Sequence, residues 1–571
     1  NKKRYMMNAS LKWQAADWLN VVGRVNLDNS DYRNKNEKSA STLTTFCGVS
    51  GGFEDAMRQE RSLYADFLAN IDKTFGDFHL TANVGASIYH TSMDQLYIAG
   101  DLVIPNFFQI NNINFSANYK PDPTGYEDEI QSIFASAELS WKNQLYLTVT
   151  GRNDWDSKLA FSKQKSFFYP SVGLSALLSE MVKLPEVISY AKIRGSYTVV
   201  ASSFDRFLTN PGYEYNSQTH NWANPTVYPM DNMKPEKTKS WEIGLNLKFW
   251  GNRFNLDATY YRSNTLNQTF KVDIPSSSGY KQAIVQAGNV QNQGLELALG
   301  FNDKWAGFGW SSNATFTLNR NKVKRLASGS VNPVTGEAIQ MDEMNVGWLG
   351  KENVAPRVIL TEGGSMTDIY VYNQLTKDNN GNIKVDQNGN LGITSSNTPV
   401  KVGNLDADFN LGWTNHFTYK GIDLGVVLSA RVGGLAYSAT QGILDYYGVS
   451  GTSATARDNG GIPINNGKVN AQKYYQTIGT GEGGYGRYYL YSATNVRLQE
   501  LSLNYTLPKR WFKNVANVTL GIVGRNLWMI YCKAPFDPEL SASTSSNYYM
   551  NVDYFMQPSL RNFGFNVKVQ F

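Results

Sequence analysis

The chain has 571 residues and a net charge of +5, from 53 basic and 48 acidic side chains that are spread along its whole length. A nucleic-acid-binding protein would gather its basic residues on one face or in one tail, so the dispersed charge argues against that class. Although 42% of the residues are hydrophobic, no run of 18 apolar residues occurs, and the sequence therefore contains no transmembrane helix.

Cysteine and histidine give no sign of a metal site or of a disulfide framework. Cys47 and Cys532 fit neither a set of disulfides nor a CxxC pair, and we expect both to be free thiols. The four histidines are scattered without metal-ligand spacing. The first residues form neither an initiator methionine nor a signal peptide, so we expect the chain to begin inside a longer protein.

Apolar residues alternate with polar ones along most of the chain, with the period of two that is typical of β-strands. The pattern predicts about seventeen strands, with ends uncertain by two to four residues. They lie near residues 5–14, 17–32, 61–75, 78–94, 129–142, 144–156, 166–179, 189–200, 238–250, 253–271, 289–302, 308–324, 403–420, 421–435, 491–507, 515–531 and 558–571.

The connections between these strands alternate between short and long. We predict tight turns at Ala15-Ala16, Gly76-Asp77, Asn143, Gly251-Asn252, Asp303 to Gly307 and Lys420-Gly421. Long loops are expected near 33–60, 95–128, 201–237, 272–288, 325–402, 436–490 and 532–557. Only the spacers 157–165 and 180–188 fit less neatly. Short turns on one side and long loops on the other are the signature of a transmembrane up-and-down β-barrel, in which the long loops are extracellular.

The odd strand number has a consequence for closure of the barrel. A closed antiparallel barrel needs an even number of strands, so seventeen strands cannot close one. An open sheet would leave unpaired backbone groups at its edges in lipid. We therefore expect an odd number of strands upstream. If the complete barrel resembles the 22-stranded plugged transporters, about five strands and the plug are missing from this chain, which is then one part of a single barrel domain.

The face of each strand can be assigned from the cost of burying charge. Leu297 and Leu299 alternate with Glu296, and Phe565 and Val567 alternate with Lys568 at the C-terminus. A basic residue facing lipid at the membrane midplane costs ~2–4 kcal/mol, so the charged face must line the lumen. On this basis Arg152, Asp154, Glu242 and Glu296 are predicted to be lumen-facing, where they either steer a polar solute or are simply solvated wall.

Several motifs in this chain resemble those of one protein family. They are Lys234-Pro235-Glu236-Lys237-Thr238 with Trp241-Glu242, Pro275-Ser276-Ser277-Ser278-Gly279-Tyr280, Gly288-Asn289-Val290-Gln291-Asn292-Gln293-Gly294-Leu295-Glu296, Phe168-Tyr169-Pro170-Ser171-Val172-Gly173, Lys192-Ile193-Arg194-Gly195-Ser196-Tyr197, Gly524-Arg525-Asn526-Leu527-Trp528, Phe536-Asp537-Pro538-Glu539 and the C-terminal strand. Together, and in their order along the chain, they are similar to motifs of SusC/RagA-type TonB-linked outer-membrane proteins. The family's N-terminal domain, TonB-contacting segment and plug have no counterpart here.

The resemblance implies a function and a set of partners. It implies the barrel of a TonB-dependent nutrient importer in the outer membrane of a Bacteroidota cell, and no enzyme. A SusD-like surface lipoprotein would cap the long loops, and TonB would act through the missing N-terminal part. The expected substrate is an oligosaccharide, with an oligopeptide, as for the RagA type, as the alternative.

Two short motifs suggest catalysis or nucleotide binding, but their surroundings do not support either. Gly48-Val49-Ser50-Gly51-Gly52 matches G-x-S-x-G without the strand and helix that a hydrolase needs. Gly479-Thr480-Gly481-Glu482-Gly483-Gly484 matches G-x-G-x-x-G without a following helix. We expect no cofactor. Asp378 to Asn382 and Asp386 to Asn390 form a weak candidate calcium loop, because both are poor in carboxylates.

Aromatic residues are frequent in two of the long loops. We predict that Trp222, Tyr446, Tyr447 and Tyr475 contact the substrate, because flat rings stack on apolar sugar faces and pack against peptide side chains. The alternative for each residue is an interfacial girdle or loop packing. Two other classes remain open, a structural or porin-like barrel without transport and a soluble all-β carbohydrate-binding protein.

Overall fold

The computed structural model describes residues 1–115, 121–210, 212–216, 220–230, 232–327, 330–339, 341–539 and 551–571. Its dominant feature is one sheet of 18 strands, in which the two-residue strand β11 (Val227–Tyr228) lies parallel to β14. The other seventeen strands are β1 (Lys2–Ala16), β2 (Leu19–Lys38), β3 (Gly52–Phe75), β4 (Phe78–Asp101), β5 (Asp122–Trp141), β6 (Leu145–Asp156), β7 (Phe167–Leu177), β8 (Ile188–Ser202), β12 (Glu236–Phe249), β13 (Phe254–Asp273), β14 (Gln282–Trp305), β15 (Phe308–Arg325), β20 (Phe409–Tyr419), β21 (Ile422–Val432), β28 (Asn495–Thr506), β29 (Asn517–Cys532) and β31 (Asn562–Gln570).

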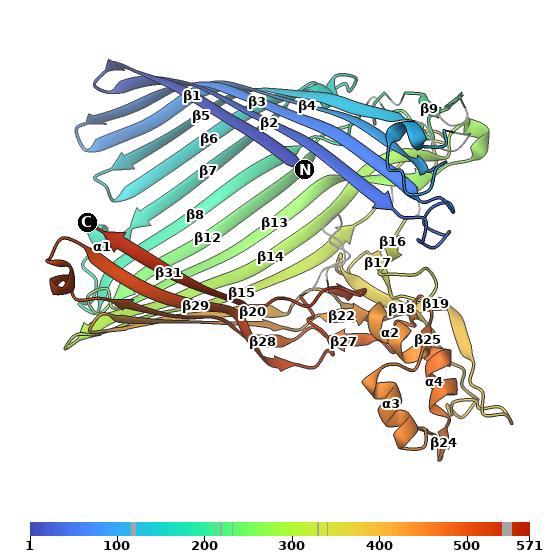
Figure 1. The fold of residues 1–571 in the computed structure, drawn as a ribbon. Coiled ribbons are helices and arrows are strands. Elements are labelled where there is room, and N and C mark those ends of the chain that lie inside the picture. Colours follow the sequence, from blue (N-terminus) through green and yellow to red (C-terminus); the bar gives the residue numbers. More distant parts are fainter. Residues whose placement is uncertain are drawn as a thin grey trace.

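These strands pair with their neighbours in chain order, and each of these pairs is antiparallel. The sheet curls into a barrel wall, with an opening between β1 and β31 (Figure 1). Within the described residues, β1 pairs only with β2, and β31 only with β29. The prediction of about seventeen strands in an antiparallel up-and-down barrel is confirmed.

The register confirms the two faces of the wall. Ile243 lies opposite Tyr260, whose ring centroid is 5.5 Å from that of Trp241 on the same face, and Glu242 lies opposite Tyr261 on the other face. Among the described residues, no second layer of protein covers the apolar flank of the terminal strand, since Phe565 is 85% exposed and Val567 is 58% exposed. The wall is therefore one strand thick, as the lipid-facing interpretation requires.

Aromatic rings form a band at the short-turn end of the wall. The ring centroids of Trp250 and Phe254 are 5.3 Å apart, those of Phe254 and Phe301 4.7 Å, those of Phe301 and Trp310 4.8 Å, and those of Trp310 and Phe417 6.1 Å. In outer-membrane barrels, girdles of aromatic residues collect where hydrocarbon meets water. The band therefore marks one boundary of the membrane.

Two turns differ from the sequence prediction. The first lies at Asp17-Trp18 instead of Ala15-Ala16, because β1 continues through Ala16 with an irregular register after Gln14. The turn predicted from Asp303 to Gly307 is shorter, because β14 continues to Trp305. Alternation identifies the interior of a strand, and it is weakest at the ends, where lipid no longer selects the side chains.

The long connections contain more regular structure than predicted. Several barrel strands run beyond the expected ends, so that the loop between β2 and β3 spans only residues 39–51. The segment 325–402 contains most of a four-stranded sheet, of β16 (Glu343–Trp348), β17 (Arg357–Thr361), β18 (Asp368–Leu375) and β19 (Ile393–Asn404). The remaining short elements are α1 (Leu178–Met181), β9 (Glu214–Asn216), β10 (Asn221–Ala223), β22 (Leu435–Ser438), α2 (Ala439–Tyr446), α3 (Gly451–Asp458), β23 (Ile462–Ile464), β24 (Gly467–Val469), α4 (Ala471–Ile478), β25 (Gly479–Thr480), β26 (Gly483–Gly484), β27 (Leu490–Ser492) and β30 (Val552–Asp553).

The loop lobe, which we define as residues 433–494, carries α2, α3 and α4 and lies beside the four-stranded sheet at the long-loop end of the wall (Figure 1). The main cluster of buried apolar side chains lies at this long-loop end, and the loop lobe, the four-stranded sheet and the ends of β13, β14 and β15 all contribute to it. It includes Val358, Ile369, Tyr437 and Tyr489, each at most 2% exposed. None of the described helices is long and apolar enough to cross a membrane.

Candidate functional site

A hollow of about 440 Å³ in the loop lobe collects three of the four residues predicted to bind substrate. Its lining residues are Asp445, Tyr446, Tyr447, Gly448, Ser453, Arg457, Ala471, Gln472, Tyr475 and Gln476, contributed by α2, α3, α4 and the turn between α2 and α3. This volume falls in the range of small-molecule sites, ~300–1,000 Å³. We call it the tyrosine pocket.

Each helix around the tyrosine pocket begins at a side-chain cap. The Ser438 hydroxyl accepts a hydrogen bond from the backbone N–H of Gln441, and the Ser450 hydroxyl accepts one from Ser453. The Asn470 side chain accepts from the N–H groups of the second and third residues of α4. Helices of eight residues are marginal alone, so these caps and the packing between the helices fix where the rings point.

The tyrosine rings stand edge to face in neighbouring pairs. The Tyr446 and Tyr447 centroids are 5.0 Å apart at 89°, and those of Tyr474 and Tyr475 are 5.2 Å apart at 84°. Tyr447 is 64% exposed, whereas Tyr446 and Tyr475 are half-buried. Burial raises the pKa of Tyr474 to about 12, so this hydroxyl stays protonated at neutral pH. The pocket thus offers flat apolar rings with neutral hydroxyl edges.

One carboxylate and one guanidinium face this pocket without forming an ion pair with each other. Asp445 is 4% exposed, and its Oδ1 accepts hydrogen bonds from Gln441 Nε2 and Thr452 Oγ1, both at 2.8 Å, and from Ser450 Oγ. Arg457 Nη1 donates to the carbonyl oxygen of Gly448 at 2.8 Å. A buried charge needs such donors to remain stable, and here hydroxyl and amide groups supply them.

Trp222, the fourth predicted residue, lies elsewhere. It belongs to the β9–β10 hairpin, is 68% exposed, and packs against Tyr215 with ring centroids 5.1 Å apart and the ring planes at 55°. No lining residue of the tyrosine pocket comes from this hairpin. The structure therefore brings Tyr446, Tyr447 and Tyr475 together and leaves Trp222 apart.

The four charged residues predicted to face the lumen share the polar face of the wall, at two separate places. Arg152 Nε donates to Asp154 Oδ1 at 2.7 Å, and the Tyr169 hydroxyl donates to Asp154 Oδ2 at 2.5 Å. Glu242 lies opposite Tyr261 on β13, and Glu296 lies opposite Thr259 on the same strand. That this face bounds the lumen remains a prediction.

Sequence reasoning missed a buried ion pair at the long-loop end. Arg497 Nη1 donates to Asp537 Oδ2 at 2.9 Å, and the two side chains are only 5% and 8% exposed. Burial of the Asp537 carboxyl opposes its ionisation, but hydrogen bonds from Arg497 and from the Ser559 hydroxyl lower its pKa overall. The sequence signal for this ion pair is Asp537 in the motif Phe536-Asp537-Pro538-Glu539, which indicates the family and does not by itself indicate the pair.

The two candidate calcium loops are closed by their own backbone. Asp378 Oδ1 accepts hydrogen bonds from the N–H groups of Asn380 and Asn382, at 2.8 and 2.9 Å. Asp386 Oδ1 is held in the same way, and the backbone N–H of Asn390 lowers the pKa of this carboxyl. In the described part of the chain, no group of three or more His, Cys, Asp or Glu side chains is arranged to hold a metal ion. A calcium site stays a prediction.

The one-layer antiparallel wall, its ring band and its long loops on one side define an outer-membrane β-barrel. Residues 1–527 match the family model described as TonB dependent receptor-like, beta-barrel, and the chain belongs to this family. The resemblance inferred from the motifs is thereby confirmed, as is the outer-membrane location.

Known relatives cover most of the chain. TonB-dependent receptor P3 of Formosa agariphila is 24% identical over 570 residues, which are 93% of this chain and 54% of the relative. TonB-dependent receptor SusC of Bacteroides thetaiotaomicron is 25% identical over 452 residues, which are 74% of this chain and 43% of SusC. The chain spans about half the length of the curated relatives it matches. These relatives are named as receptors and not as enzymes.

Solved structures share the fold. The RagAB peptide transporter superposes with a TM-score of 0.76 at 16% identity, covering 100% of this chain and 61% of the RagAB chain. A second RagAB structure, in the closed-closed state, gives the same TM-score. At this level of identity the likeness shows the fold alone.

Proposed function

We propose that this chain forms the barrel of a SusC-type importer, and that the tyrosine pocket captures an oligosaccharide. The observation that carries the proposal is the convergence of Tyr446, Tyr447 and Tyr475 on one hollow from two helices and the turn after α2. Ring faces bind the apolar faces of sugars, while the hydroxyl edges and the amides of Gln472 and Gln476 bind sugar hydroxyls. No step of this function makes or breaks a covalent bond, so no enzymatic activity is proposed.

We also propose the partners of such an importer. A SusD-like surface lipoprotein would cover the long-loop end, where the loop lobe and the four-stranded sheet extend beyond the wall (Figure 1). TonB would supply the energy for transport. The relatives named as TonB-dependent receptors support the proposal of TonB, and the relative named SusC and the match to the RagAB peptide transporter support the proposal of a lipoprotein partner.

One feature of the pocket favours an oligopeptide as the second candidate. Arg457 faces the hollow and forms no ion pair with any residue in the described ranges. A guanidinium in this position would pair bidentately with the C-terminal carboxylate of a peptide, which a neutral glycan lacks. The oligosaccharide and the oligopeptide thus differ in whether they form this ion pair with Arg457.

Uptake measurements separate the candidates. The full-length receptor, returned to a deletion strain, is compared with the triple variant Tyr446→Ala, Tyr447→Ala, Tyr475→Ala, using labelled neutral oligosaccharides and labelled oligopeptides. We expect the triple variant to lose uptake of one ligand class, while Tyr213→Ala, an exposed loop tyrosine outside the pocket, retains it. Unchanged uptake of both classes in the triple variant would show that the tyrosine pocket does not bind the substrate.

The variant Arg457→Gln then identifies the class. Loss of peptide uptake with glycan uptake intact would establish the peptide candidate. If neither class is taken up by the unaltered receptor, the alternative of a structural barrel without transport gains support.

A further inference from the structure

The glycine hairpin, which we define as residues 479–484, is the segment whose spacing matches G-x-G-x-x-G. Its two strands, β25 and β26, follow directly on α4 and pack against α2. The hairpin therefore joins the two helices that carry Tyr446 and Tyr475, and Figure 1 shows β25 beside α2 and α4. None of its residues lines the tyrosine pocket, so its effect on a ligand must pass through the residues that do.

Gly479 lies where α2 and α4 meet. A Cβ atom placed on it would stand 2.6 Å from the carbonyl oxygen of Gly442 in α2 and 2.9 Å from that of Tyr475 in α4. It would also stand 3.3 Å from the Cβ atom of Tyr446. The backbone of Gly479 is extended, with φ −91° and ψ 168°, so only the lack of space excludes a side chain here. The distance between the two helices thus depends on a residue without a Cβ atom.

Gly481, at the tip of the hairpin, lies against the Tyr446–Tyr447 ring pair. A Cβ atom on it would stand 3.2 Å from the hydroxyl oxygen of Tyr447, 3.9 Å from the Cζ atom of that ring and 4.0 Å from Cε1 of Tyr446. The optimal separation of two non-bonded carbon atoms is ~3.5–4.0 Å, so only the hydroxyl oxygen would be crowded. A methyl group at the tip would therefore displace the Tyr447 ring.

The hairpin is anchored at its base and at its tip. The buried Tyr437 hydroxyl donates a hydrogen bond to the carbonyl oxygen of Gly484 at 2.7 Å. The backbone of Gly484 also touches α2, because a Cβ atom on Gly442 would stand 2.4 Å from its nitrogen. At the tip, Lys351 Nζ lies 3.0 Å from Glu482 Oε2. A hairpin held in this way transmits added volume to the rings and does not simply move aside.

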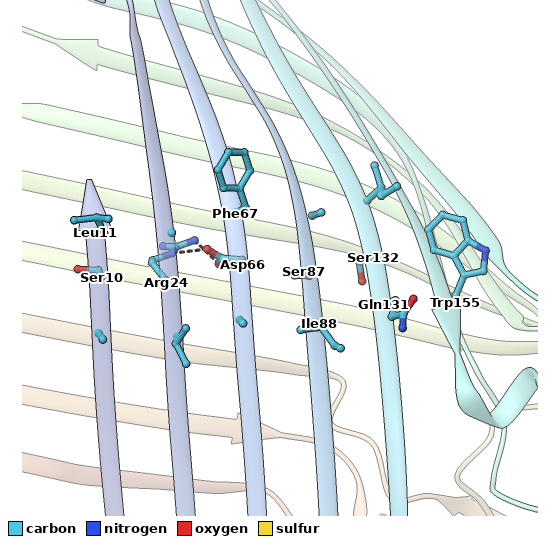
Figure 2. A pocket seen from close by; sticks show the side chains of 16 residues that line it. Ser10, Leu11, Arg24, Asp66, Phe67, Ser87, Ile88, Gln131, Ser132 and Trp155 are labelled. Carbon is cyan, nitrogen blue, oxygen red and sulfur yellow. Dashed lines mark hydrogen bonds and ion pairs between the residues drawn. The ribbon is translucent and has the colours of Figure 1, made fainter. Parts of the chain in front are cut away.

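Glycine elsewhere in the chain stands in open space. Gly23 of β2 lies between Leu11 and Phe67 and lines a hollow of about 1030 Å³ across β1 to β6 (Figure 2). A Cβ atom there would meet nothing within 4 Å. The same holds for Gly467 of β24, an exposed glycine in the loop lobe. Close contact with the pocket helices thus distinguishes the glycine hairpin.

We propose that Gly479 and Gly481 are positioning residues of the tyrosine pocket. Gly479 sets the distance between α2 and α4, and Gly481 sets the place of the Tyr447 ring. The inference rests on the proposed role of the pocket in capturing substrate. It adds that affinity for the substrate depends on two residues that do not line the pocket, because a site binds well only when neighbouring residues hold its contact groups in place.

Hydroxyl-radical footprinting of the full-length receptor tests the positioning without a ligand. The variants are Gly479→Ala and Gly481→Ala, and the matched controls are Gly467→Ala in the lobe and Gly23→Ala in the wall. We expect faster oxidation of the pocket tyrosines in both hairpin variants, because displaced rings lose the neighbours that cover them. Both controls should match the unaltered receptor. Unchanged oxidation in both hairpin variants would overturn the proposal.

A second-site change isolates the contact at the tip. Gly481→Ala places a methyl group against the Tyr447 hydroxyl, and Tyr447→Phe removes that oxygen. Oxidation of Tyr446 should therefore be faster in Gly481→Ala, whereas the double variant should match Tyr447→Phe alone. An equal effect of Gly481→Ala in both backgrounds would overturn the assignment of the tip. This comparison decides even if Gly479→Ala does not fold.

Uptake of labelled neutral oligosaccharides and of labelled oligopeptides relates the positioning to the substrate. We expect Gly479→Ala to raise the concentration for half-maximal uptake of one class about tenfold, which is close to 1.4 kcal/mol of binding free energy. Maximal uptake should stay unchanged, whereas a loss of folded receptor would lower it. Gly467→Ala should change neither quantity. If oxidation of the tyrosines changes and uptake of both classes does not, the positioning stands and the proposed role of the pocket is wrong.

Discussion

The barrel wall and the loop lobe are stabilised in different ways. In the wall most side chains are half-exposed, because one face meets lipid and the other is polar, and continuous backbone ladders connect the strands. The loop lobe has a buried core of the kind found in soluble proteins, with Tyr437 0% exposed and Tyr489 2% exposed. Burial of apolar surface from water therefore stabilises the lobe, while the wall depends on hydrogen bonds that lipid cannot replace.

This contrast teaches where each part is vulnerable. A cavity should damage the lobe and spare the wall, and a charge on the apolar face should do the reverse.

Removing the central ring of the lobe should have the largest effect. Tyr437 is fully buried and donates a hydrogen bond to the carbonyl oxygen of Gly484 at 2.7 Å. Tyr437→Ala should destabilise the lobe by ~3–5 kcal/mol, the usual cost of deleting a buried aromatic side chain. Hydrogen exchange on the full-length receptor should show fast exchange in α2 and α4 and unchanged protection in β3 and β4. Loss of protection in both parts would mean that the lobe and the wall unfold as one unit.

A charge on the apolar face should produce the opposite pattern. Leu297→Arg places a guanidinium in lipid and should cost ~2–4 kcal/mol of barrel stability. The matched control is its neighbour Glu296→Arg, which the register places on the polar face, opposite Thr259. We expect less heat-resistant barrel on gels for the first variant than for the second. Equal loss in the two variants would contradict the assignment of the faces.

Acid should loosen the last loop from the wall at Asp537. Because the pKa of Asp537 in the folded chain lies below its ordinary value, its contribution to stability is complete above that ordinary value, near pH 4. The contribution is lost as the pH falls through the folded value, when the carboxyl binds a proton and the charge pair with Arg497 ends. Proteolysis at residues 533–561 should therefore increase between about pH 4 and pH 2 with an acid-stable protease.

The matched variant for this experiment is Asp537→Asn. The amide cannot titrate, so its cleavage should already be raised at pH 7 and should change less on acidification. If the variant showed the same pH profile as the unaltered receptor, Asp537 would not be the group that titrates.

The smallest effect is expected at a helix cap in the lobe. Asn470→Ala removes the acceptor for two N–H groups of α4 and should cost ~1 kcal/mol. Asp458→Ala, at an exposed position at the end of α3 that does not line the tyrosine pocket, is the control and should change little. Because α4 carries Tyr475, a rise in the concentration for half-maximal uptake in Asn470→Ala alone would also indicate that the helix positions the ring.

The wall could be predicted well because its signal is local and repeated. Each strand alternates with a period of two, and Gly251-Asn252 sits in a turn where both residues have positive φ, at +65° and +68°. The cysteines are free, as expected. The ends of the strands were less certain. The irregular register after Gln14, for example, moves the first turn by two residues, and no pattern in the sequence announces it.

The lobe could be predicted only in part. Its tyrosines were identified by type and density, but its helices of eight residues are too short to show a periodic pattern. Tyr446 and Tyr475 are far apart in sequence and line one hollow only because α2 packs on α4. Trp222 was predicted for the same reason, as an aromatic residue in a long loop, but it lies in the β9–β10 hairpin and not at this hollow.

By itself, the sequence determined which side chains share a face, how many strands cross the membrane and which connections are long. The reason is local: along each strand, lipid contacts one set of alternate residues and water contacts the other set. The tertiary structure decided which distant residues meet. The tyrosine pocket, the Arg497–Asp537 pair and the hollow over β1 to β6 all arise from contacts between separate segments. Such contacts depend on packing and strand register, which a one-dimensional pattern does not record.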